Sequence, residues 1–497
     1  MSKYLEQHQV FPVALGNEEE SGVLVNVAGY LEEPCDLVEN FSYYVPEEYV
    51  VLAQRYRVHL KNGGRVYPGY VAEDLITNLE RTTGECATPR EVLIQDKGNQ
   101  LVLEGTIKNY LQAVAWPESE TSARVQRRVV DSIGNRKASH DNYGIADDTP
   151  LKPTGSSAKT PRSIVEHLAT RSFITGAGLV EPDGFSYAQK IGGLAGVTGY
   201  GYKGLLYRRT DDEGTHRFEV RCSDINISDW AVLARVGGTA LVLALNQTPL
   251  GKELDQKASV TLTSILDKAK ELNIMHLTPE GTLQLTPEQY AAVDFQQTIA
   301  EMAMAKLPLY IDELPPEYFE IAHEIYQYCE DYRKVASGEA GIELLADRAD
   351  WAAKLTLILR GVEKDRSFGI NRELNDITSR AKDLRYDFIG FSAVSGEVAK
   401  PEYGTGYRLR AKGQFRKTVA GSAIQKGLLT PSPFTRATAR TQLLSDYNCS
   451  YADWQKVSVM TTEYDQEDII LRDVDNPTLD PAIVALLDKI GMRNQQL

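Results

Sequence analysis

The sequence predicts an α+β fold in which strands dominate the first half of the chain and helices the middle. Strand-like segments recur early, and the clearest are residues 11–25, with an acidic centre between apolar ends, and residues 216–222. Three long segments then place apolar residues at helical spacing, at residues 287–306, 316–337 and 346–364.

Length and composition indicate a large globular protein. The chain has 497 residues, 42% hydrophobic and 25% charged, and a mean hydropathy of -0.32. Past about residue 403 the composition becomes basic and then acidic. We therefore expect one large domain over residues 1–405 and a small C-terminal domain over residues 406–497.

Charge and cysteine usage restrict the possible partners and location. A net charge of -15 and a pI near 5.1 argue against nucleic-acid binding, which needs clustered Lys and Arg. The five cysteines show no CxxC spacing, which indicates reduced thiols. The first residues are polar, and the longest apolar run, residues 230–245, contains Arg235. We therefore expect a cytoplasmic protein without a membrane span.

An acidic string, residues 16–22, lies within strand-like apolar sequence. Because the side chains of a strand alternate between its faces, Glu18 and Glu20 point to one side and Glu19 to the other. Two carboxylates on one face repel unless a cation lies between them, and such hard oxygen ligands suit Mg²⁺ or Mn²⁺. The alternative is a solvated acidic turn, which is the commoner state of an isolated acidic run.

A second strand-like segment, residues 216–222, places Arg217, Glu219 and Arg221 on one face. A carboxylate flanked by two guanidinium groups offers a metal ligand beside two phosphate-binding groups. The alternative is an ion pair on an exposed sheet surface, which contributes little stability.

Two further strings supply candidate metal ligands. Glu80 and Glu85 are an odd number of positions apart, so in a regular strand they face opposite ways unless Gly84 forms a bulge. The imidazole of His140 could complete a mostly carboxylate site, although a lone histidine more often has a structural role.

The sequence contains no P-loop for a nucleotide. The G-x-G-x-x-G string at residues 199–204 leads into strand-like residues instead of opening a helix. ATP would therefore be held through metals bound by carboxylates. Metals and arginines would then balance charge as the γ-phosphoryl group moves onto a substrate carboxylate and makes an acyl phosphate.

The order and content of these strings resemble the Pup ligase and depupylase family, which is related to glutamine synthetase. The family pattern G-x-E-x-E-x-G is matched by residues 16–22, and N-G-A-R-L-Y by residues 62–67. The pattern P-E-Y-x-x-x-E-C is matched in part by residues 79–86, with both acids and the cysteine in register. The pattern D-S-x-G-N-x-x-x-x-H-E-N-Y reappears at residues 131–143, with Asp141 in place of Glu.

Further matches follow in the same order, to T-R-x-x-x-x-G-x-G-x-V at residues 170–180, D-W-x-x-K-L at residues 350–355 and T-R-A at residues 435–437. The resemblance spans most of the chain. It implies a glutamine-synthetase-like fold, a curved antiparallel sheet cradle packed with helices, with ATP and Mg²⁺ as cofactors. It also implies roles for individual residues: Glu18, Glu20, Glu80, Glu85, His140 and Glu219 as metal ligands, and Arg217, Arg221, Asn142 and Arg436 as nucleotide contacts, Arg221 also acting in catalysis.

Two departures from the family pattern stand out. Where the family reads R-L-H-V, this chain has Glu219 at the His position, as in the R-I-E-V-R of glutamine synthetase, and a carboxylate serves Mg²⁺ at least as well as imidazole. The family continues Y-x-D, whose Asp is the base of the ligase and the catalytic Asp of the depupylase, but Gly69 stands there in this chain. Asp74, or Glu73 beside it, is the candidate replacement.

The resemblance implies a ligase that activates the C-terminal Glu of a small Pup-like protein for attack by a lysine of a target protein. It leaves open whether a bacterial proteasome is also a partner. Depupylases carry a long extra loop between the first two motifs, and the short separation of Glu18 from Asn62 leaves no obvious room for it. The alternatives are a depupylase or deamidase of the modifier, and a noncatalytic nucleotide-binding scaffold.

Overall fold

A large, mostly antiparallel sheet forms the centre of the protein. The structure is a computed structural model of the chain, and it describes residues 11–12, 14–27, 30–32, 40–54, 57–68, 77–114, 120–127, 129, 138–146, 160–182, 184–198, 204–210, 215–259, 264–278, 281–311, 314–368, 370, 373, 376–394, 397–453, 455–461, 465–471 and 477–494. The main path of the sheet runs in the order β11 (Gly196–Thr198), β12 (Gly204–Thr210), β13 (Thr215–Ser223), β8 (Ser139–Ala146), β1 (Ala14–Val27), β6 (Thr77–Thr82), β5 (Arg65–Pro68), β4 (Arg57–Leu60) and β3 (Val50–Gln54). Off this path lie β2 (Tyr30–Glu32), β7 (Glu120–Gln126), β16 (Phe388–Val394), β17 (Glu397–Val398) and β18 (Glu402–Tyr403).

Strand β1 is the central element of this sheet. It pairs with β6 through residues 18–23, with β8 through residues 14–19 and with β7 through residues 22–27, in each case antiparallel. Most of the strand-like segment predicted at residues 11–25 belongs to β1, which begins at Ala14 and ends at Val27. The acidic residues lie within β1 itself, so the alternative of a solvated acidic turn is wrong.

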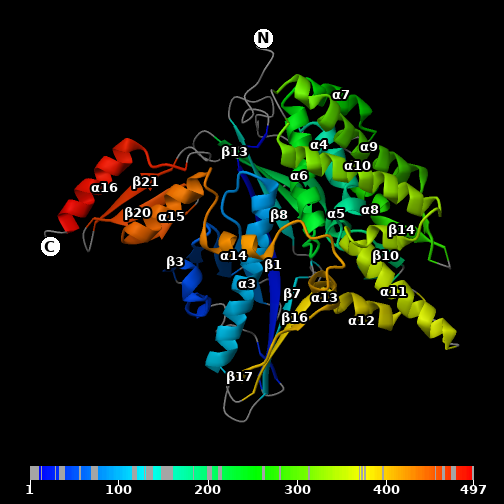
Figure 1. Ribbon diagram of the computed structural model, residues 1–497, viewed down its shortest axis with the longest axis horizontal. Helices are drawn as coiled ribbons and strands as arrows, with labels where there is room; N and C mark the ends of the chain where they lie inside the picture. Colours follow the sequence, from blue (N-terminus) through cyan, green and yellow to red (C-terminus); the bar gives the residue numbers. More distant parts are fainter. Residues whose placement is uncertain are drawn as a thin grey trace.

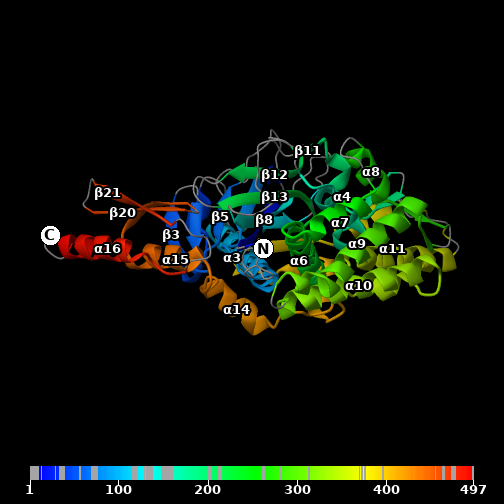
Figure 2. The same ribbon diagram turned by 90° about the horizontal axis from the view of Figure 1, so that it is seen from above.

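Helices α3 (Pro89–Val114) and α6 (Asp229–Asn246) lie on one side of β8, β12 and β13 (Figure 2). Helix α6 is buried along its whole length and on every side, which suits its almost wholly apolar sequence. Its Arg235 is also buried, and its Nε lies 3.1 Å from a carboxylate oxygen of Asp141 in β8. Among the described residues, no helix is both long and apolar enough to cross a membrane.

The predicted helical block is confirmed and lies beside the sheet (Figure 1). Its three long helices are α9 (Pro287–Ala305), α10 (Pro316–Ala336) and α11 (Asp350–Ser367). Helix α11 begins at Asp350, four residues later than expected, and a separate 3₁₀ turn precedes it at residues 342–345. The block also contains α4 (Arg162–Thr170), α5 (Ser172–Thr175), α7 (Leu250–Lys257) and α8 (Ile265–Asn273).

The last part of the chain divides between two cores. Helix α13 (Thr405–Ala411) and helix α14 (Gly421–Leu429) contribute Tyr407 and Leu428 to the core that contains α3 and β16. A separate core joins α15 (Arg436–Asp446), β19 (Cys449–Ala452), β20 (Lys456–Met460), β21 (Gln466–Ile470) and α16 (Pro481–Asn494). This C-terminal unit extends away from the helical block in Figure 1. The residues of the separate C-terminal core therefore begin after Thr435, and the predicted division at residues 405 and 406 stays a prediction.

Candidate functional site

Strand register brings most of the candidate residues to one face of the sheet. Glu18 of β1 lies opposite His140 of β8, and Asn142 of β8 lies opposite Glu219 of β13. On the other side of β1, Glu20 lies opposite Glu80 of β6. Directly opposite residues of an antiparallel pair share a face. We call the face with these six side chains the acidic face.

The opposite face of β1 has a different chemistry. Glu19 points away from the acidic face, and its Oε2 accepts hydrogen bonds from Arg81 (2.7 Å) and Arg127 (2.5 Å). The three side chains are almost fully buried, with exposures of 0% for both arginines and 2% for Glu19. The predicted alternation of the three glutamates is confirmed. We call Glu19, Arg81 and Arg127 the Glu19 cluster, and it stabilises β1 on the face opposite the acidic face.

Carboxylates crowd the centre of the acidic face. Glu18 accepts a 2.6 Å hydrogen bond from the Tyr67 hydroxyl and also contacts the carboxyl of Glu80. Burial, followed by the charge of Glu18, raises the pKa of Glu80 to about 10. Two carboxyl groups in contact need either a shared proton or a cation between them. The donor set therefore fits a hard divalent cation.

The cation would have to draw these side chains together. Across the described ranges, no three acidic, histidine or cysteine side chains are already arranged to hold a metal ion. Glu20 is 8% exposed, and its Oε2 accepts a hydrogen bond from the backbone N–H of Ala138 at 3.0 Å. Magnesium binding by Glu18, Glu20, Glu80, His140 and Glu219 remains a prediction.

Glu219 lies between two guanidinium groups, as its sequence context predicts. Arg217 Nη2 donates to Oε2 and Arg221 Nε to Oε1, each at 2.7 Å, and His140 Nδ1 lies 3.4 Å from Oε1. Burial by itself would raise the pKa of Glu219, but Arg217, His140 and Arg221 outweigh it and lower the pKa to about 2. Asn142 donates to the backbone oxygen of His140 at 3.2 Å, which places its amide beside the same residues.

Glu85 and Arg436, the predicted metal ligand and nucleotide contact, form an ion pair in the structure. Arg440 donates to both carboxylate oxygens of Glu85, at 3.0 Å and 2.7 Å, and Arg436 Nε donates to Oε1 at 3.0 Å. Strand β6 ends at Thr82, so strand pairing does not bring Glu85 onto the acidic face, and its carboxylate faces α15 instead. Glu85 and Arg436 therefore join the segment after β6 to α15, and the predicted roles of metal ligand and nucleotide contact stay predictions.

This ion pair predicts an acid-sensitive contribution to stability. Burial alone would raise the pKa of Glu85, but Arg440 and Arg436 lower it from 4.5 to about 2. Because the pKa is lower in the folded state, the charged Glu85 stabilises the fold by roughly 3 kcal/mol at pH values above its unfolded pKa. This stabilisation is lost as the pH falls from about 4.5 to 2. Chemical unfolding should therefore show Glu85→Gln less stable than the native chain near neutral pH, with a gap that closes over that range. A gap that is constant with pH would contradict this.

Sequence reasoning missed three basic or phenolic members of the acidic face. Arg65 of β5 lies opposite Thr82, which in turn lies opposite Glu18, so Arg65 shares the face. Tyr67 lies opposite Glu80, and His59 of β4 lies opposite Arg65. Arg65 and Tyr67 belong to the N-G-G-R-V-Y string, which could have indicated them.

The environment of Arg65 is strongly positive. Arg65 is 3% exposed, and burial, together with the charges of Arg440 and Arg57, lowers its pKa to about 9. Burial, followed by the charges of Arg65, Arg440 and Arg57, lowers the pKa of His59 to about 2. An excess of buried positive charge beside carboxylates that can hold a cation suits a phosphate group. Asp74 and Glu73, the candidate bases, lie outside the described residues.

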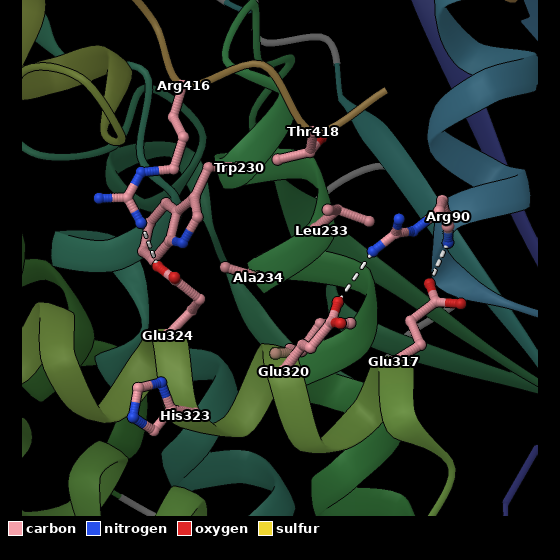
Figure 3. A pocket seen from close by; sticks show the side chains of 11 residues that line it. Arg90, Trp230, Leu233, Ala234, Glu317, Glu320, His323, Glu324, Arg416 and Thr418 are labelled. Carbon is pink, nitrogen blue, oxygen red and sulfur yellow. Dashed lines mark hydrogen bonds and ion pairs between the residues drawn. The ribbon is translucent and has the colours of Figure 1, made fainter. Parts of the chain in front are cut away.

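A pocket of about 240 Å³ lies away from the acidic face, between α3, α6 and α10 (Figure 3). Its floor is formed by Trp230 and other apolar residues. Arg90 pairs with Glu320 at 3.0 Å, and Arg416 with Glu324 at 2.6 Å. Because both arginines face carboxylates, the pocket shows no excess positive charge that would attract phosphate.

Comparison with known proteins places the chain among Pup ligases. The family model described as Pup-ligase protein matches residues 26–458. A Pup–protein ligase of Bifidobacterium longum (strain DJO10A) is 26% identical over 475 residues, which cover 90% of this chain and 88% of that protein. A Pup–protein ligase of Jonesia denitrificans is 22% identical over 437 residues, covering 84% of this chain and 85% of that protein.

Two solved structures share the fold. The complex between the prokaryotic ubiquitin-like protein Pup and its ligase PafA superposes with a TM-score of 0.73 at 19% identity, covering 96% of this chain and 92% of that one. The Pup ligase PafA in complex with ADP gives a TM-score of 0.64 at 18% identity, covering 89% of this chain and 91% of that one. The predicted α+β fold with a sheet cradle is confirmed. The match of the family model over most of the sequence shows that this chain belongs to the Pup-ligase protein family.

Proposed function

We propose that the chain is an ATP-dependent ligase that joins the side-chain carboxylate of a C-terminal glutamate, on a small Pup-like protein, to a lysine of a target protein. The observation that carries this proposal is the acidic face, where carboxylates from three strands and His140 of a fourth lie beside Arg65, Arg217 and Arg221. The similarity to Pup–protein ligases, and to the solved complexes of PafA with Pup and with ADP, supports the same conclusion.

The proposed reaction has two steps. In the first, an oxygen of the modifier's glutamate attacks the γ-phosphorus of ATP, ADP leaves, and an acyl phosphate forms. Arg217 and Arg221 are placed to neutralise the charge that develops on the transferred phosphoryl group. Magnesium, held by Glu18, Glu20, Glu80, His140 and Glu219, would screen the phosphate oxygens.

In the second step, the target lysine nitrogen attacks the acyl carbon. The carbon–oxygen bond to phosphate breaks, phosphate leaves, and an isopeptide bond remains. The attacking amine must lose a proton, and Asp74 is the proposed acceptor because Gly69 replaces the family's Asp. Arg221 is proposed to assist catalysis from its position beside Glu219.

One incubation separates the ligase from the alternatives. Purified protein would be mixed with Mg·ATP, a Pup-like protein ending in Glu and a lysine-bearing target, and analysed by intact mass and by ADP release. ADP together with a covalent adduct supports the ligase. Release of the modifier from a premade conjugate would instead indicate a hydrolase, and ATP binding without either product would indicate a scaffold. Cytoplasmic location and a proteasome partner remain predictions.

A further inference from the structure

Two buried arginines of the C-terminal unit contact the segments that flank the acidic-face strands. Arg440 of α15 is 1% exposed, and its guanidinium donates to both oxygens of Glu85 and, at 3.0 Å, to the backbone oxygen of Gly63. Thr435, at the start of α15, donates to the backbone oxygen of Glu85 at 2.7 Å. We call Arg440, Arg436, Thr435, Glu85 and Gly63 the clasp.

The clasp closes on a tight turn. Gly63 has a φ of +82°, a left-handed conformation that favours glycine. Its backbone N–H donates to the backbone oxygen of Leu60 at 2.9 Å. A Cβ at Gly63 would lie 3.0 Å from the Cβ of Ala437, so α15 rests directly on the turn. On the other side, Asn62 Oδ1 accepts from the N–H of Gly64 at 2.9 Å, and Asn62 Nδ2 donates to Asn99 Oδ1 of α3 at 3.0 Å. The turn is thus held from both domains.

This turn leads straight into the acidic face. Strand β5 begins at Arg65, two residues after Gly63, and continues to Tyr67, whose hydroxyl bonds Glu18. A shift of the turn would therefore move both Arg65 and Tyr67. The hydrogen bond from Arg440 to Gly63 therefore links the positions of Arg65 and Tyr67 to the position of α15. Arg440 and Gly63 are more than 370 residues apart in the sequence.

We propose that Arg440 is a positioning residue for nucleotide binding: through Glu85 and Gly63 it holds the turn that presents Arg65 and Tyr67, so that the acidic face binds Mg·ATP only with α15 docked. The inference rests on the proposed function. It gives the C-terminal unit a part in nucleotide binding through a contact that need not touch the nucleotide.

The test compares Mg·ATP binding, measured by titration calorimetry well below the melting temperature, in the native chain, Arg440→Ala, Arg440→Lys and Gln54→Ala. Gln54 is the matched control because its amide bonds the backbone oxygen of Ser450 at 2.9 Å, which also joins the two domains but away from the turn. We expect Arg440→Ala to weaken binding about 10-fold or more, because it removes three buried charge-assisted hydrogen bonds. Arg440→Lys should recover part of the loss, and Gln54→Ala should bind as the native chain does.

A second measurement separates positioning from general loss of structure. Mn²⁺ binding without nucleotide, followed by electron paramagnetic resonance, should stay within about twofold in Arg440→Ala, because the carboxylates of the acidic face lie outside the clasp. Glu85→Gln should weaken Mg·ATP binding in the same direction, and combining it with Arg440→Ala should add little.

The outcomes distinguish this inference from the proposed function. If the native chain does not bind Mg·ATP, the proposed function fails. If the native chain binds and Arg440→Ala binds equally well, the positioning role of Arg440 fails while the proposed function stands. Equal losses in Arg440→Ala and Gln54→Ala, or a parallel loss of Mn²⁺ binding, would also overturn the inference, because they would indicate a merely structural contact.

Discussion

Glu219→Ala is expected to abolish magnesium-dependent nucleotide binding. The carboxylate is 2% exposed and lies between Arg217 and Arg221, with His140 beside it. Removing it deletes a proposed metal ligand and leaves two guanidinium groups without their shared counter-charge. Breaking a buried ion pair in this way costs about 3–5 kcal/mol of folding stability. Calorimetric titration with Mg·ATP measures the effect directly, and native-like binding in this variant would refute the role of Glu219.

Two companion variants separate charge from shape at this position. Glu219→Gln keeps the size of the side chain but removes its charge, so we expect it to behave like Glu219→Ala. Glu219→His introduces the residue of the family pattern, which can also bind a divalent cation, and should retain measurable Mg·ATP binding. Thermal unfolding of all three variants shows whether they remain folded at the titration temperature.

The composition of the acidic face could be predicted in part because strand alternation is a local rule. Glu18 and Glu20 were expected on one side and Glu19 on the other, and the structure confirms this. The pairing of Glu18 with His140 depends on register between strands more than 100 residues apart. Register is set by the packing of the whole sheet, which the sequence of one strand does not contain.

Glu85 shows that a motif match does not reveal the ion-pair partner of a residue. The match placed it in register with a family acid, and a bulge at Gly84 was needed to turn it toward Glu80. Strand β6 instead ends at Thr82, and Gly84 packs so closely on the turn that a Cβ there would lie 2.9 Å from the backbone oxygen of Asn62. Glu85 therefore turns to Arg440, which is 355 positions away. No local pattern indicates a partner at that separation.

The Glu19 cluster was missed for a similar reason. Arg81 lies in the β6 segment quoted for its acids, and Arg127 lies in the residues that follow β7, so neither suggests the other. The two arginines contact the buried Glu19 only once β1 has paired with both β6 and β7. Buried ion pairs of this kind connect distant segments and are seen only in the folded chain.

Asp74→Asn is expected to remove turnover and leave Mg·ATP binding unchanged. In the sequence, Asp74 falls between the segments that form β5 and β6, which carry Tyr67 and Glu80 to the acidic face, and Gly69 stands at the position of the family's Asp. A base acts on the proton of the attacking lysine and takes no part in holding the nucleotide, so binding and turnover should separate in this variant.

Glu73→Gln is the matched control, because it removes the neighbouring carboxylate of the same connection. Adduct formation under saturating Mg·ATP measures turnover, and calorimetry measures binding. Full turnover in Asp74→Asn would exclude Asp74 as the base, and loss of turnover in Glu73→Gln alone would transfer that role to Glu73. If both variants turn over normally, the proton must leave by another route, and the replacement of the family's Asp by Gly69 would then reflect a different second step.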